Sequence, residues 1–410
     1  MQYINYFIGI LLLLLAFRFQ QFYQSTSKTI IDGQQIKIHV TLLTEPKIVG
    51  SQQKFVVIDD GQTFFIVTPR YPAFHYGDAL HIFGTVKKRV LTNENQVLSM
   101  YYPKIEASKK EGNFVLAPIK SGLAITSTIR QKVTLLFQNT LPSQASSLLL
   151  GITFGIKAGM TSDFFEKLKA TGVLHVIAAS GMNVTMVGGF LSSLFAVLFR
   201  RQIAILASIG GIVFYAALAG FEPSIVRASI MGILAFTAQI LGRQYLATYA
   251  LVLAAAGMLF LNPQLLFDIG FQLSFLATLG LIYIRPLLPG FPDLQTTIAA
   301  QIATLPILLA NFGTYSLFSV LVNALVLWTV PVLMIIGGVG GMVGLVFEPM
   351  GRLILYASLP FLLYFEYVVN LFSNFGTTIA INSFPWQWVA GYYCLLIVIV
   401  LHHAQKSRSY

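Results

Sequence analysis

Residues 171–190 read TGVLHVIAASGMNVTMVGGF, and this stretch decides how the rest of the chain is interpreted. It is apolar enough to cross a membrane, yet it carries His175, Ser180 and Asn183 around a Ser180–Gly181 pair. An unsatisfied polar group at bilayer depth is costly, so such groups face other helices or a water-filled path. We therefore expect a helix that is broken at Ser180–Gly181 and directs polar groups toward a path through the membrane.

The composition of the chain is that of an integral membrane protein. Hydrophobic residues make up 56% of the 410 residues, charged residues make up 10%, and the mean hydropathy is +0.74. A soluble domain carries about 25% charged residues. The net charge of +11 fits basic loops that orient a membrane protein, and it also fits an anionic partner such as nucleic acid or lipid headgroups. The single cysteine, Cys394, excludes an internal disulfide and a Cys-based metal site.

The N-terminal third divides into three segments. Residues 1–21 hold one apolar run followed by Arg18, and we expect a retained transmembrane anchor, with a cleaved signal peptide as the alternative. Residues 28–107 alternate with the period of two typical of half-buried strands, and five short strands predict a small OB-like β-barrel. Residues 108–142 begin with Lys109–Lys110 and predict an amphipathic helix in the membrane interface, ended by Pro142.

The predicted barrel mixes aromatic with basic residues. Asp60–Gly61 predicts a hairpin turn between two strands, and Tyr76–Gly77 precedes another strand. OB-folds hold single-stranded nucleic acid on aromatic side chains in a basic groove, although small barrels also use aromatic residues in their core and rim. Under the first interpretation we expect DNA contacts from Lys54, Phe65, Arg70, Lys87, Lys88 and Arg89.

Residues 143–404 are predicted to form a multi-helix membrane domain. Ten apolar runs lie near 145–159, 173–199, 202–220, 224–242, 246–261, 270–288, 295–312, 315–346, 353–374 and 388–403. One crossing needs about 20 residues, so we expect about eight to eleven spans, with 315–346 forming two helices or a re-entrant segment. Basic residues mark candidate cytoplasmic ends at Arg200–Arg201, Arg243, Arg285, Lys406 and Arg408. The predicted fold class is a polytopic α-helical membrane protein with an N-terminal soluble OB-like β-barrel domain.

Three motifs follow the predicted barrel in order. They are Gly172-x-x-His175 with residues 179–184 (ASGMNV), residues 222–228 (EPSIVRA) with Met231, and residues 268–278 (DIGFQLSFLAT) after Asn262–Pro263. A weaker later match is residues 303–306 (ATLP), then Phe312, Ser316 and Asn323. With these motifs, the chain resembles the ComEC family of competence proteins, the DNA-uptake channels of naturally transformable bacteria, over residues 28–345.

This resemblance implies a multi-pass protein of the bacterial inner (plasma) membrane that passes one DNA strand into the cytoplasm, with the OB-like domain on the outer side. The implied partners are single-stranded DNA, membrane lipid, a DNA receptor outside and a helicase-like motor inside. A separate nuclease and a homo-oligomer are left open.

The chain departs from the family in two places. Asn183 stands where the family usually has His, which argues against any role that needs an imidazole there. Long family members also carry a metallo-β-lactamase-like domain, and this sequence has no HxHxDH motif. We therefore expect no nuclease or other enzymatic activity from this polypeptide, and no cofactor.

Six positions are predicted to line the DNA path: His175, Ser180, Gly181, Asn183, Arg227 and Gln272. For His175 the alternative is one interhelical hydrogen bond, and the lack of a nearby carboxylate argues against a metal site. Structural or gating roles are expected for Glu222, Asp268, Asn311 and Asn323. Glu222 would pair with Arg227, either as a purely structural ion pair or to hold Arg227 toward passing phosphates. Asp268 would cap a helix, and the two asparagines would bridge helices.

Two other function classes compete with a DNA channel. A small-molecule permease would also carry intramembrane His, Ser, Asn and Asp residues, but it does not explain the OB-like domain. An intramembrane hydrolase would use Ser180 and His175, which lie about 140° apart on an ideal helix and have no evident orienting acid.

Overall fold

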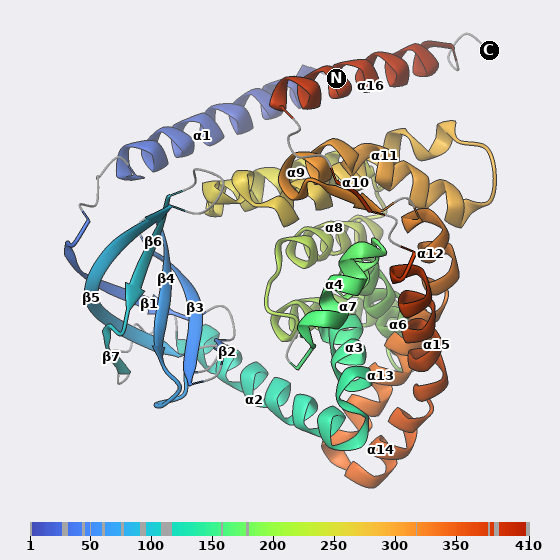
Figure 1. The fold of residues 1–410 in the computed structure, drawn as a ribbon. Helices are drawn as coiled ribbons and strands as arrows, with labels where there is room; N and C mark the ends of the chain where they lie inside the picture. The colour runs from blue at the N-terminus through green and yellow to red at the C-terminus, as the bar shows by residue number, and fades with distance from the viewer. Residues whose placement is uncertain are drawn as a thin grey trace. The chain divides into compact units, whose positions relative to one another are not determined.

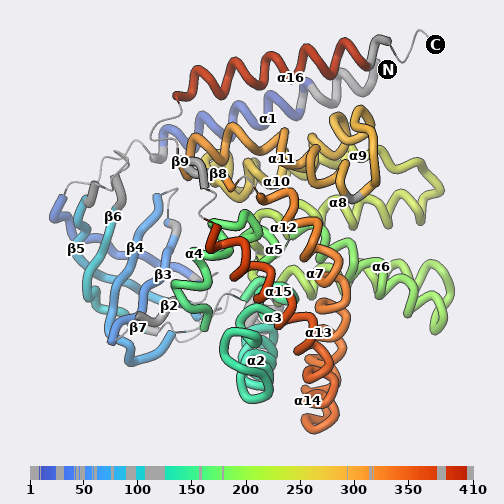
Figure 2. Tube along the Cα trace, turned by 45° about the vertical axis from the view of Figure 1, so that its right-hand side comes forward, coloured from blue at the N-terminus to red at the C-terminus, as the bar shows by residue number. Residues whose placement is uncertain are grey.

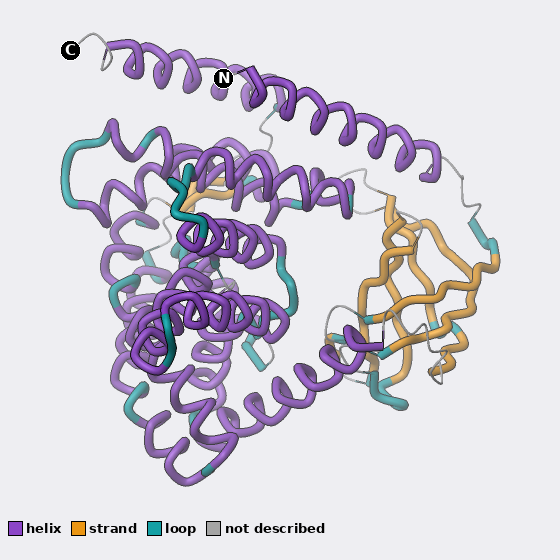
Figure 3. The backbone as a smooth tube through the Cα atoms, turned by 180° about the vertical axis from the view of Figure 1, so that it is seen from behind, coloured by secondary structure: helices purple, strands orange, loops and turns teal. Residues whose placement is uncertain are grey.

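A computed structural model describes residues 2–26, 32–42, 46–49, 51–59, 62–74, 78–90, 96–107, 117–156, 159–177, 180–316, 318–375, 378–380 and 385–406. The chain forms two compact units. The first comprises residues 1–132 and 256–264, and the second comprises residues 133–255 and 265–410. Figure 3 shows the strands in orange and the helices in purple.

The first unit contains helix α1 (Gln2–Thr26) and a curled β-sheet that forms a half-barrel (Figure 1), consistent with the predicted OB-like domain. Its strands are β1 (Gln35–Thr41), β2 (Lys47–Val49), β3 (Gln52–Asp59), β4 (Gln62–Pro69), β5 (Ala79–Val90), β6 (Gln96–Tyr101) and β7 (Lys104–Ala107). They pair in the order β1-β5-β6-β4-β3-β2, with β7 also pairing β5. The β4–β6 pair is parallel and the other pairs are antiparallel.

The half-barrel is stabilised by the side chains that point inward from each strand and pack together. Ile38 on β1 pairs with Ile82 on β5, and both are fully buried. The buried cluster consists of Ile38, Leu42, Phe55, Val57, Phe64, Ile66, Phe74, Leu80, Ile82, Val86 and Met100. Because side chains alternate across a strand, this inner set leaves the intervening residues on the water-facing side.

The sheet has seven strands where the sequence predicted five. Residues 97–105 (VLSMYYPKI) have the composition of a single strand, but they divide between β6 and β7 at Tyr102–Pro103. Tyr102 has a φ of 51°, and Pro103 has no N–H to donate to a ladder. The two pieces consequently pair with different halves of the long strand β5. The short strand β2 was not predicted, and the residues of Asp60–Gly61, Tyr76–Gly77 and Lys109–Lys110 lie outside the described ranges.

Helix α2 (Ala117–Thr140) is the amphipathic helix predicted before Pro142. Val133, Leu136 and Phe137 are buried and Lys132 is exposed, as the pattern predicted. The last turns of α2 pack against the glycine-rich helix α13.

The described elements of the second unit are mainly helices. They are α3 (Ser143–Phe154), α4 (Ser162–Ala170), α5 (Leu174–Ile177), α6 (Gly181–Leu198), α7 (Arg201–Leu218), α8 (Pro223–Ile240), α10 (Ile269–Tyr283), η2 (Arg285–Leu287), α11 (Pro292–Phe312), α12 (Ser319–Val326), α13 (Thr329–Val346), α14 (Glu348–Tyr356), α15 (Leu359–Ser373) and α16 (Trp386–Lys406). The short strands β8 (Thr314–Ser316) and β9 (Thr378–Ala380) pair with each other. Helix α9 (Ala247–Leu261) and η1 (Pro263–Phe267) cross the boundary between the units.

Seven helices within the described ranges are long and apolar enough to cross a membrane, or eight if the bent pair α14–α15 counts as one span. This number lies at or below the lower end of the expected eight to eleven, because several predicted runs do not form full spans. Residues 145–159 yield the 12-residue helix α3, and 246–261 yield the 15-residue helix α9. The long run 315–346 divides into β8, α12 and α13.

Helix α3 is the centre of the second unit. All nine residues from Ala145 to Thr153 are buried, which is the pattern of a helix surrounded by protein on every side. It contacts α13, α15 and α5 (Figure 2). Gly155 ends the helix at a φ of 68°, with its N–H bonded to the Gly151 carbonyl and the Ile156 N–H bonded to the Leu150 carbonyl.

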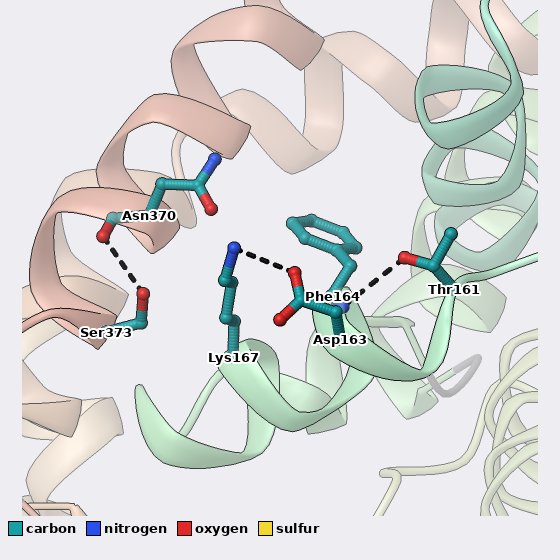
Figure 4. A network of polar contacts seen from close by, with 6 residues as sticks. All are labelled: Thr161, Asp163, Phe164, Lys167, Asn370 and Ser373. Carbon is teal, nitrogen blue, oxygen red and sulfur yellow. Dashed lines mark hydrogen bonds and ion pairs between the residues drawn. The ribbon is translucent and has the colours of Figure 1, made fainter.

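Helix α4 carries charged residues within this apolar unit. Its first turn is capped by the Thr161 hydroxyl, which accepts from the Phe164 N–H, and Asp163 pairs with Lys167 at 2.8 Å. Figure 4 shows Lys167 directed toward the end of α15, where Asn370 and Ser373 lie. The buried Phe164 attaches the helix to the unit. Helix α4 is therefore a short amphipathic helix that leads directly into the stretch 171–190.

Helices α13 and α14 approach each other so closely that only glycine fits. A methyl group added at Gly351 would lie 2.6 Å from the Gly344 nitrogen and 2.9 Å from the Gly340 carbonyl oxygen. These are backbone atoms and cannot move aside, so the two helices would have to separate.

We predict that Gly351→Ala destabilises the protein by about 1–3 kcal/mol, the usual range for overpacking. The matched control is Gly338→Ala on α13, where a methyl group would meet no atom within 4 Å. Thermal unfolding of the purified protein in detergent should show a lower melting temperature for the first variant only. Equal melting temperatures would show that this helix contact is looser than described.

Candidate functional site

The stretch 171–190 is broken where the Ser180–Gly181 pair predicted. The short helix α5 ends at Ile177, and α6 begins at Gly181 with Ser180 in an extended conformation (φ −107°, ψ 170°). The Ser180 hydroxyl caps none of the first N–H groups of α6 but donates to Asn183 Oδ1 at 3.1 Å. The N-terminus of α6 therefore lacks the side-chain acceptor that most helices have there.

Arg227 of α8 lies against this helix start. Its side chain is 8% exposed, and a methyl group added at Gly181 would lie 2.5 Å from Arg227 Nη2. Nη1 donates to the Ser274 carbonyl and to the Thr278 hydroxyl, both on α10, and the Phe275 ring centre lies 6.0 Å from Cζ. Gly181 thus permits the approach of a guanidinium that α10 holds in place.

Among the residues that the structure describes, no acidic side chain forms an ion pair with Arg227. The ion pairs found within the described ranges join Lys104 to Glu106, Asp163 to Lys167 and Glu348 to Arg352, and Arg227 forms none of them. Its hydrogen-bond acceptors on α10 are uncharged, and its Nε is buried without a partner. A helix N-terminus itself carries about half a positive charge, so the guanidinium and the start of α6 repel each other. The arrangement is one that an anion would stabilise.

Asn183 is buried and bonded to the helix at the centre of the unit. It is 1% exposed, and its Nδ2 donates to the Ile152 carbonyl of α3 at 2.7 Å. The Tyr215 hydroxyl of α7 donates to the neighbouring Thr153 carbonyl at 2.8 Å. These two bonds satisfy carbonyl groups at the end of α3 and attach α6 and α7 to the centre of the unit.

His175 and Asn183 lie in different surroundings. His175 is exposed, and its Nδ1 lies 3.1 Å from the Gly172 carbonyl oxygen, so its close partner is the backbone of its own turn. Gly172 has a φ of 75° and packs against α12, where an added methyl group would lie 2.5 Å from the Ser319 Cβ. The broken segment therefore contacts α8 at Gly181 and α12 at Gly172.

The remaining predicted residues divide into caps and internal bonds. Asp268 accepts from the Phe271 N–H at 2.7 Å and caps α10, as the sequence suggested. Gln272 donates to the Leu266 carbonyl, while its Oε1 is buried without a partner. Glu222 occupies the position before Pro223 at the start of α8, and the guanidinium that it was expected to hold is bonded to α10.

The predicted helix bridges by asparagine are not both formed. Asn311 donates to the Ile307 carbonyl of its own helix, because an amide four residues along reaches back one turn. Asn323 on α12 is 2% exposed and its Oδ1 has no hydrogen-bond partner.

The DNA-contact residues predicted in the half-barrel lie partly on one outer surface. Phe65 on β4 and Lys87 on β5 both pair with Ser99 on β6, which lies between them. Lys54 on β3 pairs with Val67, two residues after Phe65 and therefore on the same face. Phe65, Lys54 and Lys87 are exposed. Arg70 is exposed and lies over the Tyr71 ring at 5.7 Å, Lys88 is exposed, and the side chain of Arg89 lies outside the description.

The sequence analysis did not identify the residues that bind or contact Arg227 and Gly172. Ser274 and Thr278 lie within the third motif and are one helical turn apart, so their shared face was readable from spacing. Ser319, which accepts from Gln301 at 3.0 Å, carried no comparable signal, because its contact with Gly172 depends on long-range packing.

We predict that Asn183→Ala lowers the free energy of unfolding by about 1–3 kcal/mol, because the Ile152 carbonyl is left buried without a donor. Ser193→Ala on the exposed side of α6 removes a bond only to its own helix and should change stability by under about 0.5 kcal/mol. Thermal unfolding in detergent distinguishes the two variants. An unaltered melting temperature for Asn183→Ala would leave this residue free for a role in a path.

Comparison with known proteins identifies the family. The family model described as "Competence protein" matches residues 152–406. "ComE operon protein 3" of Bacillus subtilis (strain 168) is 27% identical over 210 residues, which is 48% of this chain and 26% of that protein. An "Uncharacterized protein" of Aquifex aeolicus (strain VF5) is 30% identical over 160 residues, 37% of each chain. No solved structure matches the chain.

These matches cover only about a quarter and a third of the curated relatives' own lengths. The family match, in contrast, spans more than half of this chain. It includes all three motifs, and with them Gly181 and Arg227. The resemblance to the ComEC family is thereby confirmed, and the chain belongs to the competence protein family.

Proposed function

We propose that this chain is a channel subunit of the bacterial inner membrane that passes single-stranded DNA into the cytoplasm during natural transformation. The observation that carries the proposal is the buried, un-neutralised Arg227 beside the uncapped start of α6. A plain scaffold would gain stability by neutralising this charge, since an unpaired charge within a membrane protein is costly.

The chemistry of the site suits a phosphodiester. Each phosphate of a DNA strand carries one negative charge, and guanidinium groups and helix N-terminal N–H groups are its common donors in proteins. The partnerless Nε of Arg227 and the backbone N–H groups at the start of α6, which the Ser180 side chain does not cap, would supply such donors. Their mutual repulsion would be relieved when a phosphate binds beside both groups and would return as it leaves, which favours passage over permanent binding.

Helix direction supports an outward-facing site. Gly181, Arg227 and Ser274 lie close to the starts of α6, α8 and α10, so these three helices begin at the same end of their group. The opposite ends are followed by Arg200–Arg201, Arg243 and Arg285. Basic residues concentrate on the cytoplasmic side of membrane proteins, so we infer that the site opens toward the outside, where DNA arrives.

The partners follow from the proposal together with the family resemblance. The exposed Phe65, Lys54 and Lys87 on one surface of the half-barrel support capture of a strand on the outer side. A DNA receptor outside, a helicase-like motor inside, a separate nuclease and self-association remain proposals that the family suggests. No enzymatic step is needed for the channel itself.

We predict that Arg227→Gln lowers uptake of labelled DNA into a nuclease-protected state by about tenfold or more, the loss expected for one charge-assisted hydrogen bond. Arg243→Gln, which removes an exposed arginine from the other end of α8, is the control and should leave uptake unchanged. Arg227→Lys keeps the charge and should retain part of the uptake.

Membrane abundance is measured by immunoblot for each variant, and uptake is expressed per unit of protein. Normal uptake by Arg227→Gln at normal abundance would contradict the role of this residue. Normal protected uptake in a clean gene deletion would contradict the proposed function as a whole, and uptake of a small solute in its place would favour a permease.

A further inference from the structure

We propose a second nucleotide-binding position on the half-barrel, at the outer surface of β1, β5 and β7, where a base of single-stranded DNA stacks on Phe83. This inference rests on the proposed function and adds a site that lies apart from the predicted Phe65 surface. Five residues line an open pocket of about 260 Å³ there: Lys37, His81, Phe83, Lys104 and Glu106. None of the five belongs to the contacts predicted from the sequence.

Strand register builds this pocket. Phe83 on β5 pairs with Lys37 on β1 and with Lys104 on β7, so one aromatic ring lies in a row between two lysines. His81, two residues earlier on the same face, pairs with Glu106. Leu80 and Ile82, which alternate with them along β5, face the buried cluster. Alternation therefore directs the five lining residues to the water-facing side.

Phe83 is the unusual member of this row. It is 46% exposed, at a water-facing position of the strand where a polar residue would be the usual choice. An exposed ring is a stacking surface for any nucleobase, and stacking of this kind tolerates all sequences. The pocket volume falls just below the roughly 300–1,000 Å³ typical of sites for whole small molecules, which suits a single base.

The two lysines are placed for the phosphates on either side of a stacked base. Lys37 and Lys104 are both exposed and lie on opposite sides of the ring. Lysines that neutralise phosphates release condensed counterions, which makes the binding strongly dependent on salt. An aromatic ring between two lysines fits a strand of alternating bases and phosphates better than a lipid headgroup, which has no base to stack.

Glu106 places an acidic group in an otherwise basic pocket. Its Oε1 lies 2.9 Å from Lys104 Nζ, so part of its repulsion toward phosphate is balanced. A carboxylate also accepts a hydrogen bond from the exocyclic amino group of cytosine, which thymine lacks. We therefore expect a preference for oligo(dC) over oligo(dT) that depends on Glu106.

The test uses the full-length protein in nanodiscs and fluorescently labelled oligo(dC) and oligo(dT), with affinity measured by anisotropy over a range of KCl concentrations. Phe83→Ala should weaken binding of both oligonucleotides by about five- to 150-fold, and Phe83→Tyr should restore it. Lys37→Ala should lower the slope of log affinity against log salt by about 0.7. Glu106→Ala should remove the preference for oligo(dC).

The control is Lys169→Ala, which removes an exposed lysine from α4 and should leave affinity and salt slope unchanged. Melting temperatures establish that the variants are folded.

Unchanged binding by Phe83→Ala, or a loss only in Phe65→Ala, overturns this position while leaving the proposed function intact. If Phe83→Ala loses binding to phosphatidylglycerol vesicles but not to oligonucleotides, the pocket binds lipid, and this result also overturns the proposed nucleotide position. Failure of the unaltered protein to bind either oligonucleotide counts against the proposed function itself.

Discussion

The repulsion between Arg227 and the start of α6 is the constraint on which the membrane unit depends. The guanidinium is almost entirely buried, yet its bonded partners are a carbonyl and a hydroxyl of α10 and the face of Phe275. These neutral partners bond Nη1 but do not balance the positive charge, and Nε has no partner. Real proteins accept an unfavourable local arrangement of this kind mainly at functional sites. The packing around Arg227 must then offset the repulsion between the guanidinium and the helix start.

Several features of the fold serve that arrangement. The Gly181 position has no side chain, which allows the guanidinium to reach the helix start. Asn183, two residues later, anchors α6 to the buried residues of helix α3, so the start of α6 cannot move away from the charge. At the other end of the broken segment, Gly172 packs closely against α12. The segment is thereby fixed at both ends, and the break between α5 and Gly181 persists.

The sequence predicted the class of the fold, the break and the importance of Arg227, because hydrophobic runs, a Ser–Gly pair and a charge in an apolar segment are local signals. It overestimated the spans, since α3 is apolar on every side but only 12 residues long, and only packing shows that it is a core helix. It did not predict the bond from the Asn183 amide to Ile152, 31 residues earlier, because spacing cannot show a contact formed by long-range packing. The Phe83 position escaped notice because strand pairing, which joins β1 and β7 to β5, brings its lysines together from distant parts of the sequence.

The central claim is that a DNA strand passes directly over the start of α6, and cross-linking measures this proximity. In a Cys394→Ser background, Ser180→Cys would be compared with Val197→Cys near the other end of α6, where the side chain is 84% exposed. A strand bearing a thiol-reactive group on its backbone would be arrested during uptake, and the protein–DNA adducts counted. The account predicts adducts at position 180 and none above background at position 197. Equal adduct formation at both positions, or none at position 180 while uptake proceeds, would contradict it.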